Sequence, residues 1–247
     1  MRILLTAITL SASFTLASCA ADGSADLAKI AQGAESVLSG AAGSGVLSNA
    51  DIVQGLKAAL ETGSNTVVNQ LGTTDGFNGN SLIRIPLPAS LVKAKNLAGK
   101  VGLDGPFNDL ETRLNRAAEL ATPKAKSLFL GAIKGMSVSD ARGILNGADN
   151  SATTYFRDKT GAALAAEMRP LVDDALAQVG AVNSFNKVLA SYRKIPGAPS
   201  VDADLTGHVV EKGSDGIFYY LAEEEKAIRE NPAKRTSEIL QRVFANN

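Results

Sequence analysis

The stretch that decides the fold is PFNDLETRLNRAAELA, residues 106–121. Proline suits the first turn of a helix, because its fixed φ is already helical and its missing amide hydrogen is not needed there. The apolar residues that follow recur at the three- and four-residue spacing of one helix face. They are Phe107, Leu110, Leu114, Ala117, Ala118 and Ala121. The stretch therefore predicts an amphipathic helix with one buried side.

Helical patterns continue on both sides of this segment. A first helix is expected from Ser48 to the turn TTDGFNGN at 73–80, and the prolines of IRIPLP (83–88) require an extended segment. No long alternating β pattern is present. We predict one compact, multi-helix, all-α domain over residues 48–247. Its further helices are 89–101, 122–136, a short one behind the capping box at Ser137–Asp140, 151–179 with a break at Thr160-Gly161 and a kink at Pro170, 181–194, 205–230 with a glycine break near 213–216, and 232–245.

The N-terminus carries a targeting signal. Residues 1–18, MRILLTAITLSASFTLAS, combine one early positive charge with a short apolar run, which is typical of a secretory signal peptide. Leu16-Ala17-Ser18-Cys19 resembles the bacterial lipobox, so we expect cleavage before Cys19 and lipid on its thiol. The alternative is an ordinary signal peptide with an incidental cysteine. The rest of residues 19–47, rich in Gly, Ala and Ser, predicts a flexible tether.

This N-terminus also predicts a location. A lipidated cysteine would anchor the protein in a membrane of the cell envelope. Ala20 follows the cysteine, where aspartate resembles an inner-membrane retention signal in Gram-negative bacteria. We therefore expect the periplasmic face of the outer membrane.

Composition argues against several classes of function. The chain has 25 basic and 25 acidic residues and no tryptophan, so no nucleic-acid partner is expected. Cys19 is the only cysteine and His208 the only histidine, which excludes a zinc site built from these residue types. There is neither a GxSxG nor a Walker A motif, and we expect no cofactor and no metal.

Four blocks carry a resemblance to a known family. They are IRIPLP (83–88), NRAAELATPKA (115–125), MSVSDARGILNGADNSATTYFR (136–157) and DGIFYYLAEEEKAIRENPAKRTSEIL (215–240). Together they resemble the domain-of-unknown-function 4197 family of bacterial envelope proteins, which are often lipoproteins. The resemblance implies an envelope location and no particular activity.

Glu225 is the most informative polar residue in these blocks. On a helix it would share one face with Ile217, Leu221 and Ile228, with Glu224 at the edge of that face. A carboxylate there needs a partner, a proton or a cleft, because an unpaired buried charge is costly. Arg229, one turn on, is the local candidate partner, and Arg116 and Arg235 are distant ones. A structural ion pair is the favoured interpretation over a working acid or base.

Other residues of the blocks are weaker candidates for a polar or binding site. In GADNSATTYFR, Asp149 or Asn150 can cap a helix whose first amides, with Arg157, could hold an anion. An ordinary helix cap is the favoured interpretation there. Arg116 and Glu119 of NRAAE, and Tyr155, complete the candidate set.

Two hypotheses for function follow. The first is a lipid-anchored helical binding or scaffold module that recruits an envelope protein or a small ligand. The second is an envelope enzyme that uses carboxylates such as Glu224 and Glu225, with or without a divalent cation. If Glu225 and its arginine are sealed in the core, the binding or scaffold hypothesis is favoured. The enzyme hypothesis is favoured if one open cleft collects the side chains of Glu224, Glu225, Asp149 and Tyr155.

Overall fold

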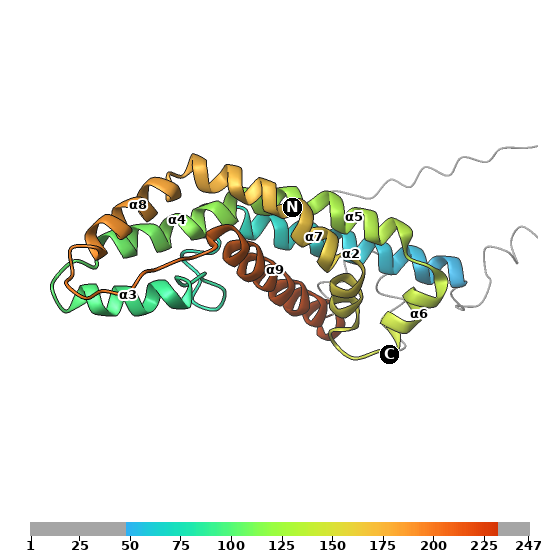
Figure 1. Ribbon diagram of the computed structural model, residues 1–247. Coiled ribbons are helices and arrows are strands. Elements are labelled where there is room, and N and C mark those ends of the chain that lie inside the picture. Colours follow the sequence, from blue (N-terminus) through green and yellow to red (C-terminus); the bar gives the residue numbers. More distant parts are fainter. Residues whose placement is uncertain (1–47, 232–247) are drawn as a thin grey trace, which may run out of the picture. The chain divides into compact units, whose positions relative to one another are not determined.

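The computed structural model describes residues 48–231 and confirms an all-α architecture over that range (Figure 1). No strand is present between these two residues. The signal peptide, Cys19, the tether, Arg235 and the helix expected over 232–245 lie outside the described residues. The elements are α2 Asn49–Leu71, α3 Ala89–Gly99, α4 Gly105–Ala121, the 3₁₀ helix η1 Thr122–Ala125, α5 Lys126–Gly135, α6 Val138–Leu145, α7 Ser151–Gln178, α8 Ala181–Tyr192 and α9 Leu205–Glu230.

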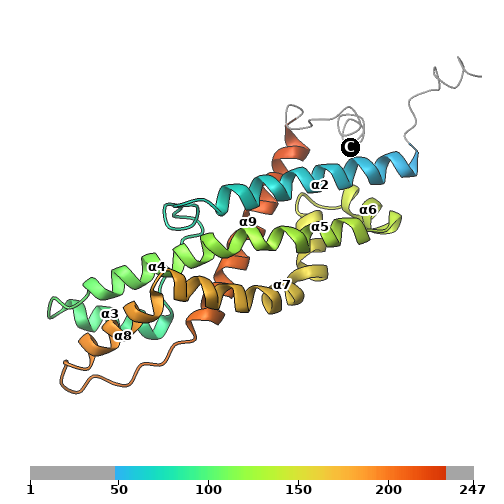
Figure 2. The same ribbon diagram turned by 90° about the horizontal axis from the view of Figure 1, so that it is seen from above.

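Helix α4 buries one side in the core, as its sequence pattern predicts. It packs against α7, α8 and α9, and Figures 1 and 2 show α8 running beside it. All six apolar residues of its predicted face are at most 4% exposed. Burying a side chain such as Phe107, Leu110 or Leu114 contributes about 1.5–3 kcal/mol. This face therefore supplies a large part of the apolar contact that holds the helices together.

Two predicted helix breaks are wrong. Helix α7 runs through Thr160-Gly161, and the Thr160 hydroxyl donates 2.7 Å to the carbonyl of Phe156 inside the same helix. Helix α9 runs through Gly213 and Gly216. A Cβ on Gly216 would lie 2.8 Å from Cε1 of Phe77, so this glycine serves close packing. Tertiary contact overrides the low helix propensity of glycine here.

The helix starts that the sequence indicates at Ser137 and Ser48 are confirmed. Ser137 accepts from the amide of Asp140 (3.1 Å) and Asp140 accepts from the amide of Ser137 (3.0 Å), which is a reciprocal capping box. Ser48 and Asp51 form the same arrangement at the start of α2. Thr122-Pro123 opens η1, which joins α4 to α5.

A carboxylate ties α4 to α8 and predicts a pH effect. Asp109 Oδ2 accepts from Nε of Arg113 (2.9 Å) and from the hydroxyl of Ser184 on α8 (2.7 Å). These hydrogen bonds, that of Arg113 first, lower the pKa of Asp109 below its ordinary value. A lowered folded-state pKa means that the unfolded chain takes up this proton more readily. The stabilisation is therefore complete above the ordinary pKa and is lost as pH falls through the lowered one.

We expect the urea midpoint of Asp109→Asn to fall less steeply than that of the wild type between pH 4 and pH 2, a range set roughly by the ordinary Asp pKa. Urea titrations at fixed pH values measure this. Asp158→Asn, on α7, is a matched control because its carboxylate is exposed. Parallel pH curves for the wild type and Asp109→Asn would contradict the assignment.

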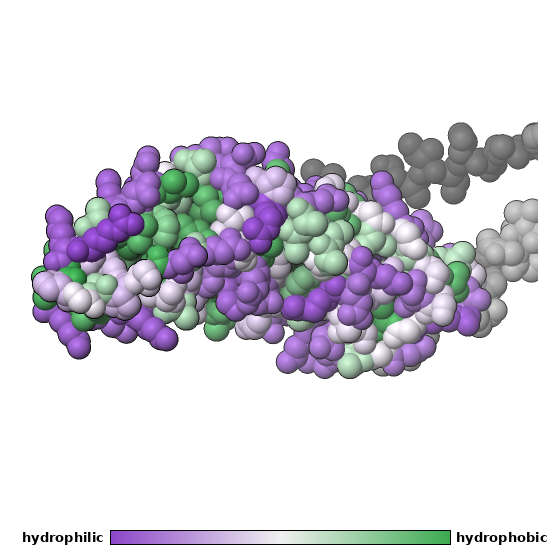
Figure 3. Space-filling model, viewed as in Figure 1, coloured by the Kyte–Doolittle hydropathy of each residue, from purple (hydrophilic) through white to green (hydrophobic). Residues whose placement is uncertain are grey.

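The face of the molecule shown in Figure 3 is mainly hydrophilic. On the face shown in Figure 3, apolar residues gather over the region of α8 and α4, and hydrophilic residues cover most of the remainder. Val182, at the start of α8, is 53% exposed. None of the helices between residues 48 and 231 is both long and apolar enough to cross a membrane.

Candidate functional site

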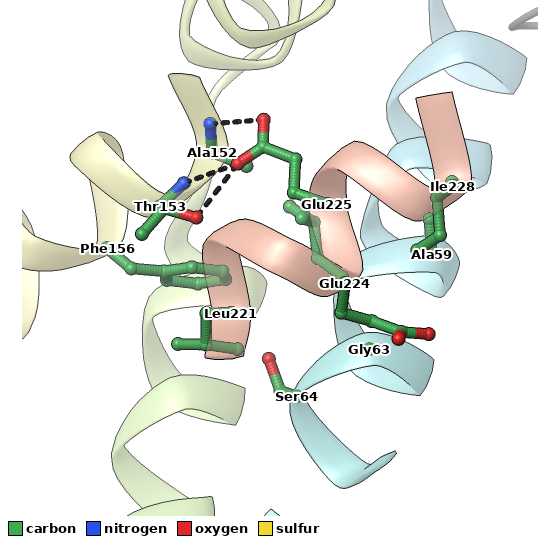
Figure 4. A pocket seen from close by; sticks show the side chains of 11 residues that line it. Ala59, Gly63, Ser64, Ala152, Thr153, Phe156, Leu221, Glu224, Glu225 and Ile228 are labelled. Atoms are coloured by element: carbon green, nitrogen blue, oxygen red, sulfur yellow. Dashed lines mark hydrogen bonds between the residues drawn. The ribbon is translucent and has the colours of Figure 1, made fainter. Parts of the chain in front are cut away.

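Glu225 lies buried on α9 and binds the beginning of α7 (Figure 4). Its Oε1 accepts from the amide of Ala152, and its Oε2 accepts from the amide and the hydroxyl of Thr153, each at 2.9 Å. The first amides of a helix have no partner within the helix, and the helix dipole favours a negative charge beside them. Glu225 therefore acts as an N-terminal cap for α7, supplied from another helix.

Arg229 is the partner of Glu225, as the four-residue spacing predicts. Its Nη2 and Nε lie 2.8 and 3.2 Å from Oε1 of Glu225. The two side chains are only 12% and 7% exposed. Arg229 also donates to the carbonyls of Ile144 (2.8 Å) and Leu145 (3.4 Å), at the end of α6. The pair thus joins the end of α6 to the beginning of α7 and anchors both to α9.

The local cap predicted for α7 is wrong, and the reason is this long-range contact. Asn150 occupies the N-cap position but its side chain makes no capping hydrogen bond, and Asp149 is exposed in the turn. The amides of Ala152 and Thr153, considered as a site for an external anion, are bonded to Glu225 instead. The anion at this helix terminus belongs to the protein itself.

A second buried carboxylate binds the loop between α2 and α3. Glu119 of α4 is 3% exposed, and its Oε1 accepts from the amides of Phe77 (3.1 Å) and Asn78 (3.0 Å). Arg116 donates 2.7 Å to Oε2 of Glu119 and 2.8 Å to Asp75. The hydrogen bond to Glu119 and, to a lesser degree, that to Asp75 raise the pKa of Arg116. Arg116 therefore belongs to the Glu119 cluster and does not pair with Glu225.

Asn115 is a buried polar residue that the sequence reasoning missed. It is 0% exposed, and its side-chain amide matches the backbone of the extended segment 83–88. The carbonyl accepts from the amide of Ile85, and the amino group donates to the carbonyl of Ile85, both at 2.8 Å. A third bond, also 2.8 Å, goes to the carbonyl of Glu111. The sequence does contain a sign of this role, because Asn115 is a polar residue that lies between the apolar positions Leu114 and Ala118 of the buried helix face.

A small cavity adjoins Glu225, between α2, α7 and α9. It holds about 20 Å³ and is lined mainly by apolar side chains such as Phe156 and Leu221. The hydroxyl of Ser64 is buried there and makes no hydrogen bond within residues 48–231. This volume suffices for about one water molecule. The cavity is therefore too small for an organic substrate.

Glu224 borders the same cavity but points away from Glu225. Figure 4 shows the Glu225 carboxylate directed at α7 and the Glu224 carboxylate directed past Gly63 of α2. The Cγ atom of Glu224 lies 3.4 Å from where a Cβ on Gly63 would be. The two neighbouring carboxylates therefore belong to different surroundings.

The remaining candidates are not brought together with Glu225. Arg157 lies 4.5 Å over the ring of Phe218 and pairs with Asp215 at 3.3 Å. Tyr155 lines a separate groove of about 400 Å³ between α5, α6 and α7, with the ammonium of Lys159 5.9 Å from its ring centre. Burial, and then the charge of Asp140, raise the pKa of Tyr155.

We looked for groups of metal-binding side chains in the part of the chain that the structure describes. No group of three or more His, Cys, Asp or Glu side chains between residues 48 and 231 is arranged to hold a metal ion.

A protein-family model matches most of the chain. The model of the family described as "Protein of unknown function (DUF4197)" matches residues 46–245. Neither the curated proteins nor the solved structures contain a significant match to the chain. The family blocks contain the side chains that join the helices, namely Asn115, Arg116, Glu119, Glu225 and Arg229. Because the match spans most of the sequence, the chain belongs to the DUF4197 family.

Proposed function

We propose that this protein is a lipid-anchored binding or scaffold module on the periplasmic face of the outer membrane. The observation that carries the proposal is Leu16-Ala17-Ser18-Cys19 behind a charged and then apolar N-terminus. A diacylated cysteine supplies about 0.8 kcal/mol of membrane binding for each buried methylene. The helical domain would then recruit an envelope protein or a small ligand.

The surroundings of the buried carboxylates support binding over catalysis. Glu225 receives five hydrogen bonds, from Ala152, Thr153 and Arg229. Glu119 receives three, from Phe77, Asn78 and Arg116. A general acid or base must reach the proton that it transfers. Both carboxylates are instead directed at backbone amides of the protein, and the cavity beside Glu225 holds only about 20 Å³.

The anchor is tested with Cys19→Ala. Without the thiol no thioether can form, so the variant is expected to lose label from radioactive palmitate and to migrate as the uncleaved precursor. Ser18→Ala is the matched control, because alanine is also small and should permit cleavage and lipidation. Palmitate labelling of Cys19→Ala at the wild-type level would overturn the anchor.

The binding role is tested by affinity capture of the lipidated protein from native membranes, followed by mass spectrometry. We expect a reproducible protein or small-molecule companion that a control lipoprotein does not recover. Val182→Asp replaces an exposed apolar side chain in the first turn of α8 with a charge and is expected to reduce recovery of a protein companion. Recovery no higher than that of the control lipoprotein would count against a binding role.

A further inference from the structure

We propose that Asn146, in the turn between α6 and α7, is a site of spontaneous deamidation. Asparagine is most reactive in this way when glycine follows it, and the chain has two such pairs, Asn78-Gly79 and Asn146-Gly147. The structure protects the first pair and leaves the second open. This inference does not depend on the proposed function.

The reaction needs only water and the chain itself. The backbone nitrogen of the glycine, as it loses its proton, attacks Cγ of the asparagine, and the side-chain nitrogen leaves as ammonia. Water then opens the resulting cyclic succinimide. Attack of water at Cγ gives aspartate, whereas attack at the main-chain carbonyl carbon gives isoaspartate, whose backbone runs through the side chain. Glycine favours the first step because its nitrogen is not shielded by a side chain and its backbone turns freely.

Hydrogen bonds hold both reacting groups of Asn78-Gly79. The side-chain Nδ2 of Asn78 donates to Oδ1 of Asp75, and the amide of Gly79 donates to the carbonyl of Asp75, both at 3.0 Å. The amide of Asn78 donates 3.0 Å to the buried carboxylate of Glu119. The side-chain oxygen of Asn78 is buried as well. The nitrogen of Gly79 can therefore reach Cγ only when the loop between α2 and α3 opens.

The pair Asn146-Gly147 is held much less firmly. Both residues are exposed, directly after the end of α6. Within residues 48–231 the side chain of Asn146 makes no hydrogen bond. The amide of Gly147 donates to the carbonyl of Ile144 over a long 3.3 Å. Rotation about the Cα–C bond of Asn146 breaks this hydrogen bond and brings the nitrogen to Cγ, so the attack requires only local motion.

The turn itself requires the glycine of the reactive pair. A Cβ on Gly147 would lie 2.8 Å from the carbonyl oxygen of Gly143, closer than Cβ atoms come in proteins. It would also meet the hydroxyl of Ser151, the first residue of α7. The connection from α6 to α7 therefore keeps a glycine behind Asn146.

Deamidation changes a joint that Arg229 holds. Arg229 donates to the carbonyls of Ile144 and Leu145, the two residues directly before Asn146. Isoaspartate at 146 lengthens the backbone by a methylene group immediately after these carbonyls. It also adds a negative charge to a turn that already contains the exposed Asp149. The modified turn is therefore expected to hold the end of α6 less firmly.

Ageing of the full chain tests the assignment. The native protein and protein unfolded in guanidinium chloride are kept at mildly alkaline pH and digested with trypsin, and deamidation is located by fragmentation of peptides 58–84 and 143–157. In the native protein, Asn146 is expected to deamidate at least about tenfold faster than Asn78. In the denaturant the two rates should agree within about threefold, because the protecting hydrogen bonds are gone. Asn150, exposed in the same turn but followed by serine, should be slower than Asn146 in both states.

Two variants separate the causes. Asn146→Gln keeps an amide at this position, but its longer side chain closes a ring far less readily, so modification at 146 should disappear. Asp75→Gly preserves the positive φ of 66°, which glycine adopts freely, and removes the acceptor of Asn78 Nδ2. The deamidation rate of Asn78 should then rise at least about threefold, while that of Asn146 stays at its wild-type value.

Thermal unfolding measures the effect on the joint between α6 and α7. Aged protein with isoaspartate at 146 is expected to unfold about 3 °C below fresh protein, whereas aged Asn146→Gln should keep its Tm. Equal Tm values for fresh and aged wild type would refute this effect. The deamidation site itself is wrong if native Asn78 reacts as fast as Asn146, or if Asn146 reacts more than about tenfold slower in the native protein than in denaturant.

Discussion

Glu225→Ala is expected to destabilise the domain by about 3–5 kcal/mol, the usual cost of removing one partner of a buried ion pair. The substitution leaves the guanidinium of Arg229 only 12% exposed and without its carboxylate. It also leaves the amides of Ala152 and Thr153 without their acceptor at the beginning of α7. Urea unfolding followed by circular dichroism at 222 nm measures the loss.

Glu223→Ala is the matched control for this prediction. Glu223 lies on the same helix two residues earlier, and its side chain is exposed. Its removal should change stability by less than about 0.5 kcal/mol. A Glu225→Ala protein as stable as this control would show that the carboxylate does not hold α7 in place.

A double replacement separates a structural role from a chemical one. Glu225→Leu/Arg229→Met removes both charges and fills the space with apolar atoms. The double variant should recover the part of the loss that comes from the buried charge of Arg229, while the amides of Ala152 and Thr153 stay without their acceptor. If the carboxylate only joins helices, the double variant should also capture the same membrane companions as the wild type. A stable double variant that captures none of them would give Glu225 or Arg229 a role in binding.

Local patterns in the sequence predicted much of the fold. The apolar face of α4, the capping box at Ser137 and the pairing of Arg229 with Glu225 all depend on residues three or four positions apart. Contacts at this spacing form within one helix, so a single sequence contains them. The expected location and lipid anchor remain predictions, because they concern residues outside 48–231.

The remaining features depend on contacts between distant residues. The cap of α7 comes from Glu225, 73 residues after Ala152, while the local pattern pointed to Asp149 or Asn150. Gly213 and Gly216 look like helix breakers until α9 is packed against α4 and Phe77. Such contacts override local propensity and are not visible in a single sequence.

The second large effect is expected from Asn115→Ala. Asn115 satisfies both backbone groups of Ile85, and both residues are 0% exposed. The neighbouring residues Pro86 and Pro88 have no amide hydrogen, so this stretch has few other ways to bond to the core. Each of these two buried backbone groups left without a partner costs about 1–3 kcal/mol, which gives a loss of roughly 2–6 kcal/mol.

Limited proteolysis locates this effect in the extended segment. The bond after Arg84 is a trypsin site directly before Ile85, and the Arg84 side chain is 45% exposed. If Asn115 holds the segment, Asn115→Ala should increase cleavage there by at least about tenfold under native conditions, since local opening becomes more frequent. Asn108→Ala, exposed on the same helix, should leave both the cleavage rate and the urea midpoint near their wild-type values. Equal cleavage rates in the two variants would mean that segment 83–88 is fixed by other contacts, such as the 2.7 Å hydrogen bond between His208 and the carbonyl of Pro86.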